Sequence, residues 1–194
     1  MSRHEGIPLR LLRQLGGGTR RPSLLVTTSH RPSRRTRSFV RELEGVLEGA
    51  VRLTRGHLSI RDLDSIAREI GVSRVLVVSD RSGNPGLVVG YAPSEGGLAE
   101  VGRVRLLGVT LAREIRSRAR VRCSGVYPAD ASSKEAAELL ARLMGLPLLG
   151  EPKGGYLEVR SEGDLFIVVP RSGKAFSGPV MRVRAALVGR QGNG

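Results

Sequence analysis

The sequence contains few of the residues on which disulfides, zinc clusters and aromatic binding platforms depend. Its single cysteine, Cys123, can form neither an internal disulfide nor a cysteine cluster for zinc. It has no tryptophan, and its three phenylalanines and three tyrosines are scattered along the chain. Proteins that read single-stranded RNA on a sheet or barrel stack the bases on clustered aromatic side chains. The composition therefore excludes that class of protein.

The chain also lacks any apolar run that approaches the ~20 residues needed to cross a bilayer. Its first stretch, MSRHEGIPLR, has no apolar core of the kind that a secretory signal requires. An apolar share of 40% is nevertheless enough for a folded core. We therefore expect a soluble protein of the cytoplasm that has no membrane partner.

Residues suited to catalysis or metal binding are sparse as well. His4, His30 and His57 lie far apart in the sequence, and no G-x-x-x-x-G-K-[ST] phosphate loop occurs. Asp80 ends a predicted strand, where catalytic acids often lie in α/β folds, but a structural role at a turn is favoured. Cys123 is expected to be a buried apolar residue rather than a nucleophile. We therefore predict that the protein is no enzyme and uses no metal, cofactor or small-molecule substrate.

What the sequence has in excess is positive charge. It contains 32 lysines and arginines against 18 aspartates and glutamates, which gives a net charge of +14, and all but three of the cations are arginine. The first 60 residues alone carry twelve arginines and four glutamates. A phosphate-rich partner fits this charge, because each neutralised phosphate releases counterions and the guanidinium fork matches phosphate oxygens. Codon preference would explain arginine over lysine but not the net charge, so we predict a folded RNA as the partner.

Apolar spacing predicts an α/β domain that follows a basic arm. Residues 1–22 contain a run of three glycines and are expected to form a flexible basic N-terminal arm. Helices are predicted after the N-cap residues Ser33 and Ser59, the second of which opens a capping box with Asp62. Strands are predicted over residues 24–29, 50–55, 75–78, 87–91 and 104–111.

The pattern starts again in the second half of the chain. An S-x-x-E capping box at residues 132–135 predicts a helix that ends at Gly145, and strands are predicted over 155–159, 165–169 and 180–188. The helical positions Phe39, Val40 and Leu43 recur one hundred residues later as Leu139, Leu140 and Leu143. We therefore predict two similar halves, about 23–111 and 112–194, each with a mixed sheet and packed helices.

The densest basic stretch joins the first strand to the first helix. Free N–H groups and the dipole at a helix N-terminus favour anions, and on a helix Arg34, Arg37 and Arg41 fall within roughly 60° of one another. The alternative is an ordinary amphipathic helix whose arginines pair with Glu44 or Glu48. The candidate RNA contacts are Thr28, Ser29, His30, Arg31, Ser33, Arg34, Arg35, Arg37, Arg41, Arg52 and Arg55.

A second arginine group lies between the two halves. It consists of Arg113, Arg116, Arg118, Arg120 and Arg122. In an extended backbone the last four side chains point to one side. A second RNA-binding patch and a solvated linker are both open interpretations.

Several of these stretches resemble the Brix-domain family. The likeness to the family's opening motif is specific, and it is carried by Thr27-Thr28-Ser29, Pro32-Ser33, Arg35-Thr36-Arg37, Phe39 and Glu42-Leu43. Three further stretches resemble the family's N-R-G…L segment, its apolar hairpin and its C-terminal G-P segment: Thr54-Arg55-Gly56 with Leu63, Val77-Val78 with residues 83–89, and Gly178-Pro179 with residues 181–187. The resemblance runs from about Leu24 to Gly189. Residues 96–100 lack the aromatic G-P-T stretch of eukaryotic members, which is typical of a minimal, archaeal-type member.

This resemblance implies a ribosome biogenesis factor that binds precursor rRNA or a guide RNA and assists rRNA processing and folding. The implied partners are those RNAs and ribosome assembly proteins. Among family members, the likeness is strongest to the one that works with the small nucleolar RNA of small-subunit processing. The resemblance also makes residues 23–194 a Brix domain, whose two halves each resemble the anticodon-binding domain of class IIa aminoacyl-tRNA synthetases.

Three other functions stay open from the residues alone. One is a stand-alone tRNA-binding module that resembles an anticodon-binding domain and serves a synthetase. Another is a metal-dependent nuclease or phosphoesterase that uses Asp80 and His30. The third is a protein scaffold whose positive charge only aids solubility. The RNA preference, the metal dependence of cleavage and the salt dependence of binding distinguish these functions from one another.

Overall fold

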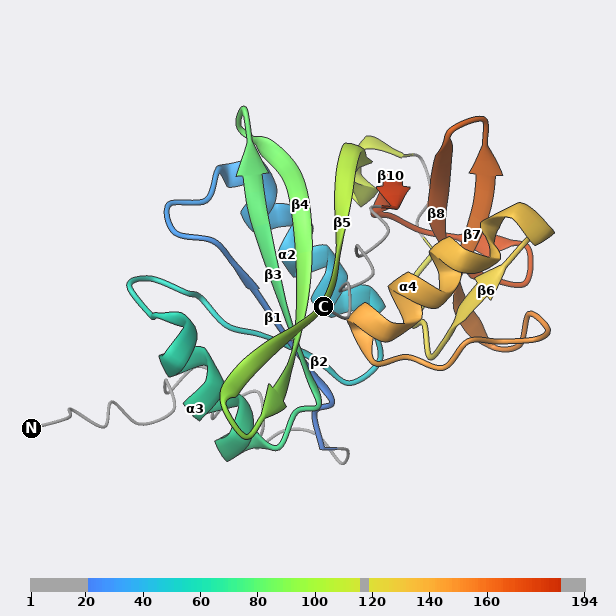
Figure 1. The fold of residues 1–194 in the computed structure, drawn as a ribbon. Helices are drawn as coiled ribbons and strands as arrows, with labels where there is room; N and C mark the ends of the chain where they lie inside the picture. The colour runs from blue at the N-terminus through green and yellow to red at the C-terminus, as the bar shows by residue number, and fades with distance from the viewer. Residues whose placement is uncertain (1–20, 116–118, 186–194) are drawn as a thin grey trace, which may run out of the picture.

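The computed structural model describes residues 21–115 and 119–185, which form one continuous mixed sheet with helices on both faces (Figure 1). The helices are α2 (Arg34–Val46), α3 (Ile60–Ile70) and α4 (Lys134–Met144), with short 3-10 turns η1 (Ala112–Glu114) and η2 (Ala131–Ser133). The strands of the first half are β1 (Leu24–Thr28), β2 (Ala50–Arg52), β3 (Arg74–Arg81), β4 (Asn84–Ser94) and β5 (Gly97–Thr110). Those of the second half are β6 (Val126–Pro128), β7 (Gly155–Glu162), β8 (Leu165–Ser172), β9 (Ala175–Phe176) and β10 (Val180–Ala185).

The strand order corrects our expectation of a separate sheet in each half. The order is β2-β1-β3-β4-β5-β10-β8-β7-β6, with β9 paired to β8. The antiparallel pair of β5 and β10 joins the halves, from Val180 opposite Thr110 to Ala185 opposite Val104. Two separate sheets would each leave an edge strand unpaired at this point, and joining them satisfies those backbone groups.

The strand order also repeats across the β5–β10 pair. In the first half β1, α2, β3, β4 and β5 occur in this order, with β2 and α3 inserted between α2 and β3. In the second half β6, α4, β7, β8 and β10 occur in the same order, with β9 inserted between β8 and β10. In each series the first strand pairs in parallel with the strand that follows it in the sheet, and the next pairings are antiparallel. The N-cap residues of α2 and α4 are Ser33 and Ser133, the offset of one hundred that the apolar positions predicted.

Alternation along β1 and β3 separates two core clusters. Leu24 on β1 and Leu76 on β3 pack in the cluster that contains the buried residues of α2 and α4. The intervening Leu25 and Val75 pack on the other face with Leu63 of α3. Because successive strand residues point to opposite faces, α2 and α4 cover one face of the sheet and α3 the other.

Local signals set most helix and turn boundaries as predicted. The Ser59 capping box forms, with the Asp62 amide 3.2 Å from Ser59 Oγ, and α3 ends at Gly71 in the left-handed region at φ 74°. Ser82 and Gly83 both have positive φ and form the tight turn between β3 and β4. In the second half the predicted box at residues 132–135 is wrong, because Asp130 caps the preceding turn and accepts the Ser133 amide at 2.9 Å.

The second predicted strand is shorter than expected. It covers only Ala50–Arg52, because the chain then turns toward α3. The Leu53 amide still donates to Val26, whereas the Leu58 amide donates back to the Arg55 carbonyl at 2.9 Å. This turn places the segment after β2 beside the loop that leads from β1 to α2.

Helix α4 packs closely on β4 at Gly90. A Cβ atom at this position would lie 2.6 Å from Leu143 Cδ2 and 3.1 Å from the Leu143 backbone. Gly90→Ala should therefore lower the free energy of unfolding by about 1–3 kcal/mol, the range for overpacked cores. Urea unfolding would measure this loss. Gly45→Ala, on an exposed helical site with nothing within 4 Å, should instead be neutral or stabilising, and equal stabilities of the two variants would contradict the close packing.

Candidate nucleic-acid interface

A cavity of about 300 Å³ lies where the β1–α2 loop meets the segment that follows β2. We call it the Arg55 cavity, and it is lined by Thr28, Arg31, Pro32, Arg37, Val40, Arg52, Leu53, Thr54, Arg55, Gly56 and His57. Five of the sequence-predicted RNA contacts line it together: Thr28, Arg31, Arg37, Arg52 and Arg55. The prediction missed Thr54 and His57, although both flank the Arg55-Gly56 pair of the family-like segment.

The exposed face of α2 carries the arginines that the helical spacing predicted. Arg34, Arg37 and Arg41 are exposed, whereas Phe39 and Leu43 on the opposite side are buried. None of the ion pairs that join described residues involves these three arginines. Described carboxylates pair instead with seven other arginines: Arg35, Arg52, Arg68, Arg103, Arg160, Arg171 and Arg182.

The N-terminus of α2 is capped from within the protein. Asp80 on β3 accepts the Ser33 amide at 2.6 Å, and the Thr36 hydroxyl also donates to it. Ser33 Oγ accepts the Thr36 amide at 3.1 Å and lies 3.3 Å from Asp80 Oδ1. The Asp80 carboxylate therefore occupies the helix end at which we expected phosphate, and Ser33 and Asp80 together fix α2 to β3.

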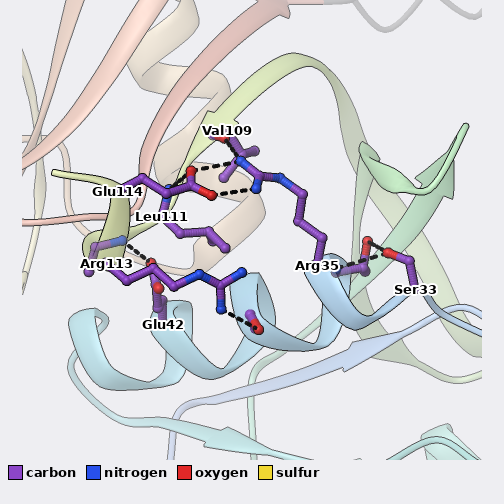
Figure 2. A network of polar contacts seen from close by, with 10 residues as sticks. Ser33, Arg35, Glu42, Val109, Leu111, Arg113 and Glu114 are labelled. Atoms are coloured by element: carbon purple, nitrogen blue, oxygen red, sulfur yellow. Dashed lines mark hydrogen bonds and ion pairs between the residues drawn. The ribbon is translucent and has the colours of Figure 1, made fainter.

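Arg35 turns away from the exposed arginines of α2. Figure 2 shows its side chain extending to Glu114 and to the carbonyl of Val109. Its Nη2 donates to Glu114 Oε2 and to the Val109 oxygen, both at 2.7 Å. A second bond joins Nη1 to the other carboxylate oxygen. Arg35 thus ties α2 to the end of β5, and its guanidinium is engaged within the fold.

Glu114 receives donors from two directions in this network. The Arg35 guanidinium, followed by the Leu111 amide at 2.9 Å, lowers the pKa of Glu114 to about 2. Beside it, Glu42 accepts the Ala112 amide at 2.8 Å, and burial raises the pKa of Glu42. The two carboxylates hold the turn that follows β5 against α2.

Acid should weaken this connection in a defined range of pH. The folded pKa of Glu114 lies below its ordinary value of 4.5, so the stability that it adds is present above pH 4.5 and is lost as pH falls toward 2. We expect Glu114→Gln to be less stable than the wild type at neutral pH and to lose less stability over this interval. Urea unfolding at a series of pH values measures both effects. Glu138→Gln on α4 is the control, and a Glu114→Gln profile parallel to that of the wild type would contradict the assignment.

Arg55 and Arg52 enter the cavity in different ways. Arg55 is only 7% exposed, and it donates through Nε to the Leu58 carbonyl at 2.9 Å and through Nη1 to the Thr28 carbonyl at 3.5 Å. Burial lowers the pKa of Arg55, and the nearby Tyr91 opposes that shift. Arg52 pairs through Nε with Glu44 at 3.0 Å. Of these two cavity-lining arginines, Arg52 is therefore paired with a carboxylate, whereas the described hydrogen-bond partners of Arg55 are neutral.

The remaining candidate residues shape the β1–α2 loop. The Ser29 amide donates to the Val78 carbonyl at 2.8 Å, and His30 Nδ1 lies 3.1 Å from the Gly56 carbonyl oxygen. Arg31 has a φ of 51°, in the left-handed backbone region that residues other than glycine rarely adopt. These contacts fix the loop between β3 and the segment after β2, and the exposed Arg31 lines the cavity.

The second arginine group contacts α2 rather than forming one described patch. Arg122 Nη1 donates to the Glu44 and Leu47 carbonyls at 3.1 and 3.3 Å, where it satisfies the end of α2. Arg113 Nη1 lies 3.4 Å from Ser38 Oγ. Arg120 is exposed, while Arg116 and Arg118, like most of the predicted N-terminal arm, lie outside the described residues.

Sites for other chemistry are not found in the described ranges. Across residues 21–115 and 119–185 no three His, Cys, Asp or Glu side chains gather in a way that could hold a metal ion. No helix in that part of the chain is long and apolar enough to cross a membrane. Cys123 is fully buried, as predicted, and burial raises its pKa to about 12. His30 and Asp80, the pair of the nuclease alternative, each bond to other groups.

No model of a protein family matches the chain, but solved structures do. A crystal structure of a probable ribosomal biogenesis protein from Aeropyrum pernix is 34% identical, covers 85% of this chain and 97% of its own, and superposes with a TM-score of 0.75. The crystal structure of Mil, an archaeal Imp4-like protein, is 25% identical, covers 83% of this chain and 96% of its own, and has a TM-score of 0.63.

Curated protein sequences also match this chain, over shorter stretches than the solved structures do. A probable Brix domain-containing ribosomal biogenesis protein of Aeropyrum pernix is 49% identical over 67 residues, which are 34% of this chain and 37% of that protein. The U3 small nucleolar ribonucleoprotein protein IMP4 of Bos taurus is 38% identical over 77 residues, 39% of this chain and 26% of that protein. The matched stretches are thus less than half the length of these relatives.

Proposed function

Because this chain belongs to the Brix-domain family of ribosome biogenesis proteins, we propose that it binds precursor rRNA or a guide RNA and assists the processing and folding of rRNA. It does so as a binding protein without catalytic turnover. The contacts are the exposed arginines of α2 together with the Arg55 cavity. Ribosome assembly proteins are its further partners.

One observation carries this proposal. Arg34, Arg37 and Arg41 stand on one exposed helix face and take part in none of the ion pairs between described residues, whereas seven arginines elsewhere pair with carboxylates. Like charges on adjacent helical turns destabilise an isolated helix. Phosphate groups of an RNA would neutralise them and release counterions.

The name of one relative supports a particular class of RNA as the ligand. The Bos taurus relative is named as a protein of the U3 small nucleolar ribonucleoprotein, which supports a guide RNA or the rRNA that it pairs with as the ligand here. The repeated strand and helix order supports our proposal that each half resembles a class IIa anticodon-binding domain. That likeness keeps tRNA as the competing ligand.

Ultraviolet crosslinking of the tagged protein in its host, followed by sequencing of the bound RNA, tests the proposal. We expect reads concentrated in precursor rRNA or a guide RNA, and loss of that enrichment in a variant with Arg34, Arg37 and Arg41 replaced by glutamine. Reads concentrated in tRNA would replace the proposal with the synthetase-associated module. Absence of any enriched RNA would leave a protein scaffold as the better account.

A further inference from the structure

We propose that the Arg55 cavity is a binding site for the phosphate of a single nucleotide, with the attached nucleoside against the apolar wall. This inference rests on the proposed RNA-binding function and adds a specific subsite to it. The exposed arginines of α2 would contact phosphates along the RNA backbone. The cavity would bind a single nucleotide that is unstacked from its neighbours.

Arg55 is the central observation. The residue is only 7% exposed, and no ion pair between described residues involves it. A guanidinium has five N–H donors, and the described bonds of Arg55 use two of them, to Leu58 and Thr28. Burying a charge is costly unless an opposite charge and hydrogen bonds compensate it. An anion in the cavity would supply both to the remaining donors.

Other cations converge on the same space. Arg31, Arg37 and Arg52 line the cavity together with Arg55. Only Arg52 has a described carboxylate partner, Glu44, and that pairing uses its Nε and leaves its two terminal nitrogens without a described bond. The backbone of Arg31 lies in the left-handed region, which residues other than glycine rarely adopt because it costs conformational free energy. Four arginines and no carboxylate are among the residues that line the cavity, and the one described carboxylate partner, Glu44, lies outside that lining, so the space has a net positive field.

The dimensions and the walls distinguish a nucleotide from a bare anion. The volume of about 300 Å³ lies at the lower end of small-molecule sites and exceeds what one phosphate group fills. Pro32, Val40 and Leu53 form apolar wall beside the arginines, and the flat surface of a base or the carbon side of a ribose can pack there. The phosphate then meets the guanidinium groups, which bind phosphate oxygens in bidentate geometry.

Titration calorimetry of the full chain tests the site with small probes. The probes are the four nucleoside 5′-monophosphates, the matching nucleosides, inorganic phosphate and a dinucleotide with an internal phosphodiester. We expect the monophosphates to bind more tightly than inorganic phosphate and the nucleosides not to bind. Binding of the dinucleotide would identify an internal phosphate as the natural ligand, and its failure to bind would identify a terminal one.

Two variants connect binding to the cavity. Arg55→Gln should weaken monophosphate binding by at least about tenfold, the loss expected for hydrogen bonds to a charged group. Arg142→Gln, an exposed arginine on α4, should leave it unchanged. If Arg55→Gln does not fold, Arg37→Gln on the exposed face serves instead, and the Nε–H resonance of wild-type Arg55 should shift on addition of monophosphate.

Failure of this proposal is distinct from failure of the proposed function. If the wild type binds an rRNA fragment but no monophosphate, or if folded Arg55→Gln binds monophosphates as the wild type does, the cavity proposal is wrong and RNA binding stands. If monophosphates also fail to shift the Arg55 resonance, the same conclusion holds without any variant. If the chain binds no RNA at all, the proposed function itself is wrong.

Discussion

Replacing Arg34, Arg37 and Arg41 by glutamine should weaken binding to an rRNA fragment on the order of 100-fold near 0.1 M salt, without loss of folding. All three side chains are exposed, and none belongs to an ion pair between described residues. Glutamine keeps a side chain of similar length and good helix propensity. Because three phosphate contacts would be lost, the slope of log K against log salt should fall by about 2–3.

A matched control separates a local site from bulk charge. Arg61, Lys134 and Arg142 are also exposed helix residues, and replacing them by glutamine makes the same change in net charge. We expect this control variant to bind the RNA nearly as the wild type does. If the two triple variants lose equal affinity, or if the α2 variant keeps the wild-type salt slope, the exposed face of α2 is not the RNA contact.

Asp80→Ala should lower the free energy of unfolding by about 2–3 kcal/mol, a large share of the stability of a domain. The change removes the acceptor for the Ser33 amide, the Ser33 hydroxyl and the Thr36 hydroxyl. Thr36 is fully buried, so its hydroxyl would lose its carboxylate acceptor and keep only the Ser33 hydroxyl at 3.2 Å. Helix α2 would also lose a negative charge at its N-terminus. Thermal or urea unfolding measures the loss.

The same variant discriminates between a structural and a catalytic Asp80. Under the structural account, Asp80→Ala binds RNA as the wild type does at temperatures where it is folded, and Asp80→Asn retains part of the stability. Asp164→Ala, at an exposed turn, is the control for removing an acidic side chain. A metal-dependent RNA cleavage that disappears in a folded Asp80→Ala protein would instead support the nuclease alternative.

Local patterns predicted the elements around the site because their causes are local. The spacing of Phe39, Val40 and Leu43 predicted the buried face of α2, and Ser33 predicted its start. The repeat of that spacing in the second half matched the start of α4 as well. Helix periodicity and caps depend on residues a few positions apart, so one sequence is enough to read them.

The contacts that local sequence patterns did not predict join residues that are far apart in the chain. Arg35 bonds to Glu114, 79 positions later, and Ser33 bonds to Asp80, 47 positions later. Helix geometry indicates only that Arg35 points away from the exposed face of α2, because it lies about 100° from Arg34 around the helix axis. Nothing local indicates the joining of β5 to β10, which turned two predicted sheets into one.

Arg55 illustrates the same limit at the centre of the site. Its charge and its family-like segment make it a candidate RNA contact, and arginine is almost never fully buried unless it is paired. Its burial arises because the turn after β2 closes over it, with its Nε bonded to the Leu58 carbonyl. Sequence spacing places Arg55 near the loop but does not indicate that its charge is enclosed in a cavity.

The most direct test of the account is the equilibrium affinity of the unaltered chain for a precursor rRNA fragment and for a tRNA of similar length, each measured over a series of salt concentrations. If the protein is a ribosome assembly factor that holds folded rRNA through its phosphates, it binds the rRNA fragment more tightly than the tRNA. The logarithm of its binding constant then falls steeply and linearly with the logarithm of the salt concentration. An affinity that hardly changes with salt, or a preference for the tRNA, would contradict it.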